Sequence, residues 1–207
     1  MEGLCSLNFN LIDFILMQYQ TEPKVPDVMG HLLAPYKSNK TWDDAAIDLM
    51  ARESHLLMNA GSDTTRTTLA SALLKLAKHP EYAKKLREAL EPHVSQTPDA
   101  EIHHDKISIL EILDGVIWEA LRLFPPNPSH PTRVTPAEGA MIADERIYPR
   151  ATEFIPERWS SSPYLVKDKK ATAPFSIGPY NCIGKPLAMM NVRVTPARII
   201  MRYDFRS

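Results

Sequence analysis

The chain has 207 residues, with 24 Lys and Arg against 25 Asp and Glu, which gives a formal net charge of −1. This balance argues against a nucleic-acid partner and against an anionic membrane held by bulk charge. A hydrophobic fraction of 44% and a charged fraction of 24% are ordinary for a globular protein and exclude wholesale disorder. Two cysteines, Cys5 and Cys182, exclude a disulfide framework and are compatible with a reducing compartment.

The N-terminal segment has neither a membrane span nor a secretory signal in its sequence. Its most apolar run, Leu11 to Met17, contains Asp13, whereas a spanning helix needs about 20 mostly apolar residues. The first residues, Met1 to Gly3, lack the basic region of a signal peptide. We therefore expect a soluble, intracellular chain, and composition leaves peripheral membrane association open.

Helical patterns dominate from the N-terminus onward. Residues 1–22 predict a short amphipathic helix, and residues 27–35 predict a further turn or two. The strongest pattern runs from Thr41, a good N-cap, to His79, which precedes Pro80. A helix of this length would span roughly 57 Å at 1.5 Å per residue, so we expect it to thread the middle of a larger body.

The remaining elements are shorter and are separated by prolines and polar residues. The pattern predicts a helix from Pro80 to Val94, a polar loop from Ser95 to Asp105, a helix from Ile109 to Phe124, and a last helix from Pro186 to Arg202 that Pro196 interrupts. Residues 125–163 are rich in proline, with short strands expected near 132–134 and 140–142. The sequence thus predicts a mainly α fold with minor β structure.

One loop carries a thiol at a distinctive spacing. Phe175, Gly178, Cys182 and Gly184 follow the pattern F-x-x-G-x-x-x-C-x-G. Gly178 permits a tight turn, and Gly184 leaves room for something flat. The helix expected after Lys185 points its amides toward Cys182, which stabilises a thiolate. A single thiolate suits haem iron and not zinc, although a buried structural cysteine is the alternative.

Two further patterns are suggestive and have plain structural alternatives. Glu119 and Arg122 share one helix face, so they could brace a loop together with Arg158, or form a solvated surface pair. Residues 61–65, Gly-Ser-Asp-Thr-Thr, are weak helix formers, which indicates either a functional groove or a random kink. His103 and His104 are adjacent in a polar loop, and we expect both to be solvated.

Four segments, which follow the family's order along residues 60–184, resemble signatures of the cytochrome P-450 family. Phe175–Gly184 resembles the haem-ligand loop, in an idiom that looks most like filamentous-fungal members. Ala60–Thr65 resembles the oxygen-activation segment of the family's long central helix. Glu119–Arg122 resembles the E-x-x-R pair of its K helix, and Phe154–Trp159 resembles its P-E-R-F/W segment.

The resemblance implies a fold and a cofactor site. The fold would be the C-terminal part of the cytochrome P-450 fold in one domain, residues 1–207, with a long central helix, K helix, meander, cysteine loop and L helix. Cys182 would be the axial thiolate of haem (iron protoporphyrin IX). Phe175, Gly178 and Gly184 would shape its loop, and Arg133, otherwise a surface arginine, would grip a haem propionate.

The resemblance also implies roles for polar residues and an activity. Asp63 and Thr64 would relay protons on the oxygen side of the haem, and Glu119, Arg122 and Arg158 would be structural. The reaction would insert one oxygen atom of dioxygen into a small organic substrate, with electrons from an NADPH-dependent reductase. Members of the family associate with the endoplasmic reticulum, so this chain would lie on its cytoplasmic side.

The sequence also departs from the family pattern. We expect that the family's N-terminal half is absent, that a strand segment near residues 149–150 is deleted, and that the chain stops at Ser207 before the last strands. Tyr180 stands where many members carry an Arg or His for a propionate. Because oxygen activation needs a dry pocket, we expect little turnover from this chain alone. The alternative is a non-catalytic remnant or interaction fragment that binds haem weakly or not at all.

Overall fold

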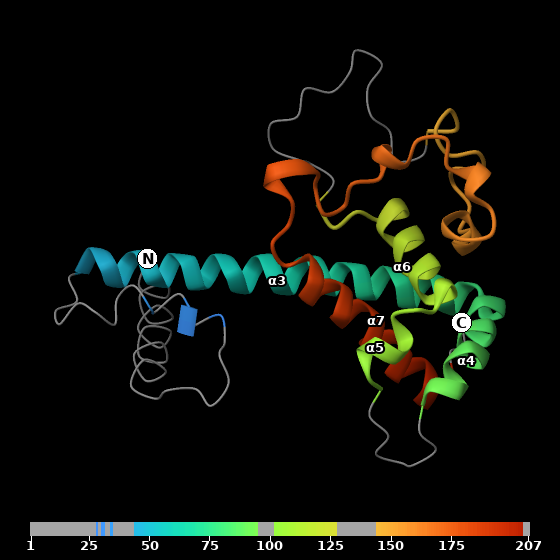
Figure 1. Ribbon diagram of the computed structural model, residues 1–207, viewed down its shortest axis with the longest axis horizontal. Helices are drawn as coiled ribbons and strands as arrows, with labels where there is room; N and C mark the ends of the chain where they lie inside the picture. The colour runs from blue at the N-terminus through green and yellow to red at the C-terminus, as the bar shows by residue number, and fades with distance from the viewer. Residues whose placement is uncertain are drawn as a thin grey trace. The chain divides into compact units, whose positions relative to one another are not determined.

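The computed structural model describes residues 44–94, 102–127 and 144–204, together with Val28, Gly30, His31 and Ala34, which are helical as predicted. Helices make up most of these ranges (Figure 1). They are α3 (Asp44–Lys78), α4 (Pro80–Leu90), α5 (His104–Ile107), α6 (Glu111–Leu123) and α7 (Lys185–Arg202). Short 3₁₀ turns are η1 (Glu91–His93), η2 (Pro156–Trp159), η3 (Pro163–Leu165), η4 (Lys169–Ala171) and η5 (Gly178–Tyr180).

The mainly helical fold class is confirmed, and the described ranges contain no strand. The strands expected near 132–134 and 140–142 lie outside the described residues, as does the helix expected over 1–22. Contacts divide the chain into two compact units, residues 1–60 and 61–207. Within the described helices, no segment is long and apolar enough to cross a membrane.

Helix α3 runs for 35 residues without a break, which confirms the long helix predicted between Thr41 and His79. The weak run at 61–65 stays α-helical, so the helix does not break there. The hydroxyls of Thr67 and Thr68 donate to the carbonyls of Asp63 and Thr64, each at 2.9 Å. The helix therefore accommodates Thr67 and Thr68 because their hydroxyls donate to its own backbone carbonyls.

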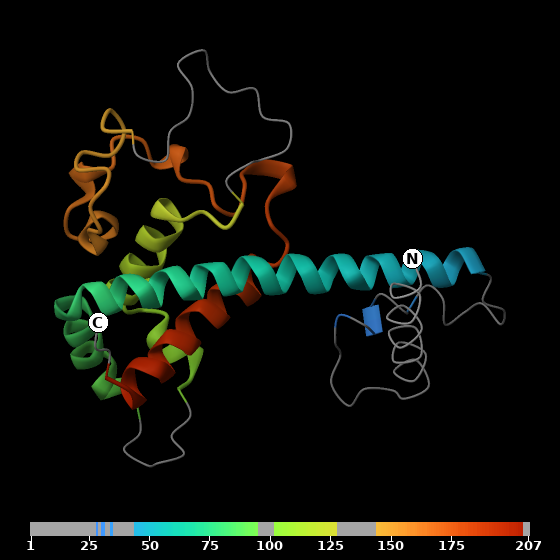
Figure 2. The same cartoon turned by 180° about the vertical axis from the view of Figure 1, so that it is seen from behind.

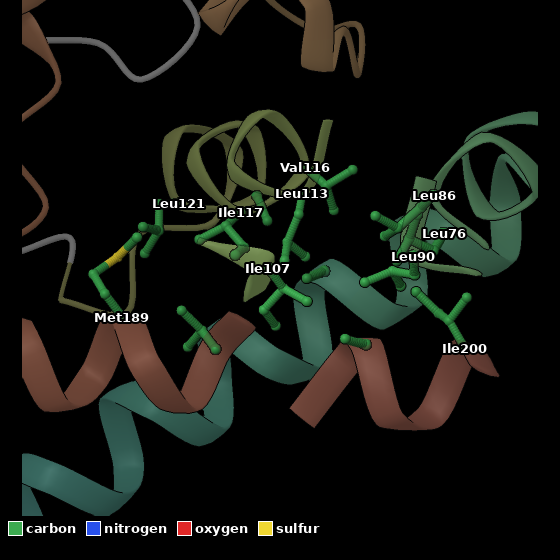
Figure 3. Close-up of a cluster of buried hydrophobic side chains, with 14 of the residues drawn as sticks. Leu76, Leu86, Leu90, Ile107, Leu113, Val116, Ile117, Leu121, Met189 and Ile200 are labelled. Atoms are coloured by element: carbon green, nitrogen blue, oxygen red, sulfur yellow. The ribbon is translucent and has the colours of Figure 1, made fainter. Parts of the chain in front are cut away.

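A core of aliphatic side chains lies within residues 61–207. It draws on helices α3 to α7: Leu76 from α3, Leu86 and Leu90 from α4, Ile107 from α5, Leu113, Val116, Ile117 and Leu121 from α6, and Met189 and Ile200 from α7 (Figure 3). Full burial of one such side chain stabilises a fold by about 1.5–3 kcal/mol. This shared burial holds α6 and α7 in place, and these two helices flank the candidate site.

Helix α7 passes through Pro196 without interruption, so the predicted break there is wrong. A proline inside a helix costs about 3 kcal/mol because it removes one hydrogen bond and clashes with the preceding turn. Pro196 itself is buried, and Val192 and Ala197 beside it are almost fully buried in the core. Packing of α7 therefore offsets the local preference of its sequence.

Polar contacts hold α7 at its C-terminal end and at its middle. Arg87 of α4 donates to the carbonyls of Ile200 and Tyr203, at 2.8 to 3.1 Å, and pairs with Asp204 at 2.7 Å. These bonds satisfy carbonyls that a helix C-terminus leaves open. Earlier in α7, Arg193 pairs with Asp114 of α6 at 2.7 Å and contacts His104 of α5 at 3.1 Å.

The polar loop predicted from Ser95 to Asp105 is wrong at its end, because α5 begins at His104. His103 has extended backbone and is exposed, as expected for a solvated histidine. His104, in contrast, is not fully solvated as we expected, because it is half-buried beside Arg193. A helix of four residues depends on tertiary contacts of this kind, which have no local signature in the sequence.

Candidate functional site

Glu119 is a fully buried carboxylate at the centre of a polar cluster. Arg122 donates to both of its oxygens, from Nε at 2.9 Å and from Nη2 at 2.8 Å. Arg158 donates from Nε at 3.2 Å, and the backbone amide of Ile155 donates at 3.1 Å. The indole N–H of Trp159 donates at 2.9 Å. Both arginines are almost fully buried, so the expected cluster of Glu119, Arg122 and Arg158 is confirmed as one hydrogen-bonded group.

The two arginines use their remaining donors to hold the segment that follows α6. Arg122 donates to the carbonyls of Ala151 at 2.7 Å and Glu153 at 3.1 Å. Arg158 donates to the carbonyls of Pro149 and Leu165, at 2.9 and 2.7 Å, and also to that of Arg150 at 3.0 Å. Among the described residues, no buried side-chain nitrogen or oxygen lacks a partner. The cluster thus fixes residues 149–165 on α6. Because every buried polar group in it has a partner, the network can stabilise this arrangement.

The backbones of α6 and η2 also touch directly. A Cβ atom added at Gly115 would lie 2.6 Å from the carbonyl oxygen of Pro156, closer than real Cβ atoms come to other atoms. Glycine is therefore required by the close approach and not by its backbone angles. This contact lies one helical turn before Glu119 and brings Ile155 within reach of its carboxylate.

The junction of Pro149 and Arg150 lies inside a hydrogen-bonded turn. The carboxylate of Glu145 accepts hydrogen bonds from the amides of Arg150 at 2.8 Å and Ala151 at 3.0 Å. Arg150 has a φ of 59°, which lies in the left-handed region that residues other than glycine rarely adopt. These bonds and those from Arg158 hold the strained residue in place. That the family segment is deleted near 149–150 stays a prediction.

A second polar pair joins α4 to η2. The hydroxyl of Tyr82 donates to Glu157 at 2.7 Å, and Lys85 donates to the other oxygen at 3.2 Å. Burial acts to raise the pKa of Glu157, but hydrogen bonds from Tyr82, its own backbone amide and Lys85 outweigh burial and lower it. Burial, followed by the hydrogen bond to Glu157, raises the pKa of Tyr82 well above its ordinary value.

The loop between Phe175 and α7 turns tightly and returns on itself. Gly178 has a φ of 79°, so glycine is needed there and the predicted turn at this residue is confirmed. The amide of Cys182 donates to the carbonyl of Phe175 at 2.8 Å, and the amide of Lys185 donates to the carbonyl of Cys182 at 3.3 Å. Cys182 therefore stands directly before the first turn of α7, with an exposed thiol.

Neither the backbone conformation nor the packing of the described residues requires a glycine at position 184. Its φ is −80°, an ordinary value, and an added Cβ would meet the Sγ of Cys182 at 3.9 Å, which is normal van der Waals contact. A bare backbone beside an exposed thiol suits a flat group lying against the loop. Among the described residues, no three or more His, Cys, Asp and Glu side chains gather to hold a metal ion. The donor set, one thiol, fits a metal whose other ligands come from a macrocycle.

The remaining predicted site residues lie elsewhere. Asp63 and Thr64 lie on α3, a separate element from the cysteine loop. The carboxylate of Asp63 is 66% exposed and pairs with Arg66 at 3.1 Å, whereas Thr64 is half-buried. Arg133 lies outside the described residues, and the structure describes nothing of the side chain of Tyr180.

The fold is that of a cytochrome P450. The crystal structure of a cytochrome P450 (CYP102L1) superposes with a TM-score of 0.74 over 93% of this chain and 48% of that chain, at 23% sequence identity. The sequence model of the family described as cytochrome P450 matches residues 11–138 and 131–207. The chain therefore belongs to the cytochrome P450 family, a family of haem-thiolate proteins whose cofactor is haem.

Similar curated proteins include fungal oxygenases. Tryprostatin B 6-hydroxylase of Neosartorya fischeri is 42% identical over 94% of this chain and 38% of its own length. Cytochrome P450 monooxygenase notG' of Aspergillus versicolor is 40% identical over 88% of this chain and 37% of its own length. This chain thus spans less than two fifths of the length of these relatives.

Proposed function

We propose that this chain carries the haem-binding portion of a monooxygenase that inserts one oxygen atom of dioxygen into a small organic substrate. The observation that carries the proposal is the exposed thiol of Cys182, held by its amide directly before α7 in a loop of the family's ligand pattern. Haem with an axial thiolate supplies the oxygen-activating chemistry in this family when it is bound. The names of the similar fungal oxygenases support the reaction class.

Cys182 would hold the iron as a thiolate, and its surroundings suit that state. The amides in the first turn of α7 face the residues before Lys185, and the positive end of a helix favours an anion there. Phe175 accepts the Cys182 amide through its carbonyl, so the backbone on both sides of the thiol is fixed. Gly184 would let the macrocycle approach, and Gly178 provides the turn that returns the loop.

Other residues would act around the haem. We propose that Asp63 and Thr64 of α3 hold and move protons on its oxygen side, which is general acid–base work through water. Arg133 would bind a propionate. Electrons would come from an NADPH-dependent reductase, as the family resemblance implies. Association with the endoplasmic reticulum stays a prediction for this chain.

A second candidate, a remnant that binds haem weakly or not at all, is favoured by the surface around the thiol. Ile183 is 94% exposed, and Leu187 and Ile177 are 56% and 59% exposed. If a bound haem does not cover these side chains, the site stays open to water, whereas a functioning site must exclude water.

The two candidates are separated by a haem titration. The purified chain receives haem, is reduced, and is then exposed to carbon monoxide, and its difference spectrum is recorded. We expect a thiolate-type Soret band with labile binding, and its loss in Cys182→Ala but not in the matched variant Cys5→Ala. Absence of haem uptake by the wild-type chain would favour the remnant. A band that survives in Cys182→Ala would overturn the ligand assignment.

A further inference from the structure

Trp118 lies between the buried carboxylate cluster and the cysteine loop. It precedes Glu119 on α6, and its ring centroid lies 6.0 Å from that of Trp159, whose indole N–H is bonded to Glu119. On its other side, the ring of Phe175 meets it edge to face at 6.1 Å and an angle of 84°. Phe175 is the first residue of the loop pattern. One aromatic ring therefore contacts both the buried cluster and the loop.

Lys185 reaches the same two rings from the far end of the loop. Its Nζ lies 5.9 Å from the centroid of Trp118 and 5.6 Å from that of Phe175. A cation within about 6 Å of an aromatic face is attracted by the ring quadrupole. Lys185 begins α7 and its amide donates to the carbonyl of Cys182. The side chains at the start and the end of the loop thus meet on Trp118.

The contacts of these side chains bear directly on the backbone around the thiol. The carbonyl of Phe175 accepts the amide of Cys182 at 2.8 Å, so contacts that restrain Phe175 also restrain the residue whose carbonyl orients Cys182. Ser176 and Gly178 have φ values of 61° and 79°, so the intervening turn is a tight one. A tight turn that includes a left-handed serine needs outside contacts to persist.

We propose that Trp118 and Lys185 form a clamp that positions the Cys182 loop against α6, and that both are positioning residues for the thiol. The clamp transmits the rigidity of the Glu119 cluster, through Trp159 and Trp118, to the loop. Core packing alone would ask only for an apolar side chain at 118, whereas the clamp asks for an aromatic ring at 118 and a cation at 185. The two requirements can be tested separately.

The test measures hydrogen exchange of the Cys182 amide in the chain without haem. An aromatic or cation–π contact is worth about 0.5–1.5 kcal/mol, so losing it speeds loop opening by roughly twofold to tenfold. We expect Trp118→Leu and Lys185→Met to speed exchange of this amide by that factor. The conservative variants Trp118→Phe and Lys185→Arg should restore most of the protection, because ring and cation remain.

Two controls separate the clamp from general destabilisation. Leu113→Ala removes a fully buried side chain from the same helix and should lower the free energy of unfolding without selectively exposing the Cys182 amide. Lys84→Met removes a charge from an exposed site on α4 and should change nothing in the loop. Unchanged exchange in Lys185→Met, at a partly exposed position, would overturn the clamp. Equal loop exposure in Leu113→Ala would overturn it too.

A second readout uses the haem-loaded chain and rests on the proposed function. The ratio of thiolate-type to neutral-thiol-type bands in the reduced carbon monoxide spectrum should shift toward the thiol in Trp118→Leu and Lys185→Met. The same ratio should stay at the wild-type value in Lys84→Met. If the wild-type chain takes up no haem, the proposed function fails while the exchange experiment still decides the clamp.

Discussion

Gly115 on α6 and Pro156 on η2 are in backbone contact, with room for no side chain between them: an added Cβ would lie 2.6 Å from the Pro156 carbonyl oxygen. The contact matters because η2 contains Arg158 and Trp159, two of the donors to Glu119. A wider gap between α6 and η2 would lengthen those hydrogen bonds. Gly115 therefore controls the geometry of the cluster without taking part in it.

We expect Gly115→Ala to destabilise the chain although alanine is the better helix former. Overpacking costs about 1–3 kcal/mol, against a gain in helix propensity of about 1 kcal/mol. Urea unfolding should therefore show a net loss. Gly61→Ala is the matched control, since Gly61 also lies within a helix but nothing lies within 4 Å of its added Cβ. Gly61→Ala should be neutral or stabilising, and the same sign for both variants would contradict the close contact.

Glu119→Gln should be among the most damaging single substitutions. It leaves the charges of Arg122 and Arg158 buried without a counter-ion, and breaking a buried pair costs about 3–5 kcal/mol. The measurement is the free energy of unfolding in urea. Glu153→Gln, which breaks an exposed pair with Arg150, should cost no more than about 1 kcal/mol. Similar losses for the two variants would mean that the buried network contributes little.

The long helices were predictable because their signals are local. Apolar residues at helical spacing and a proline after His79 defined α3 nearly to its observed ends. The pairing of Glu119 with Arg122 followed from their separation of three residues on one helix. The tight turn at Gly178 followed from the freedom of glycine. In each case, the residues concerned are neighbours in sequence.

The contacts that were missed join residues far apart in the chain. Tyr82 and Glu157 are 75 positions apart, and the roles of Gly115 and Trp118 depend on η2 and on the loop that pack against them. No local pattern distinguishes such residues from ordinary helix positions. The sequence let Arg158 join Glu119 and Arg122 only as one of two alternatives, and the family resemblance favoured that alternative. Trp159, its neighbour, had an indole donor whose partner the sequence left unassigned.

The Tyr82–Glu157 pair predicts how stability depends on pH. Burial and the bond to Glu157 raise the pKa of Tyr82 in the folded chain above its unfolded value of about 10. Its contribution to stability is therefore complete below pH 10 and is lost as the pH rises through the folded pKa. The lowered pKa of Glu157 acts at the other end: its contribution is present above about pH 4.5 and is lost as the pH falls through the folded value.

Tyr82→Phe should therefore flatten the alkaline limb of the stability curve, measured as the free energy of unfolding from pH 7 upward. Tyr148, whose pKa burial also raises, contributes to the limb that remains. Tyr164→Phe is the matched control, because Tyr164 is 74% exposed and its loss should leave the curve unchanged. An alkaline limb as steep in Tyr82→Phe as in the wild type would exclude the proposed coupling.

The two glycines of the cysteine loop should respond differently to alanine. Gly178 has a φ of 79°, and the left-handed conformation costs other residues about 1–2 kcal/mol, so Gly178→Ala should destabilise the chain without haem. Gly184→Ala should leave the free energy of unfolding unchanged, because its Cβ meets only the Cys182 Sγ at 3.9 Å. If a flat macrocycle lies against this backbone, the added methyl group should nevertheless weaken haem uptake in a titration. A Gly184→Ala chain that binds haem as tightly as the wild type would show that the glycine leaves no necessary space for the cofactor.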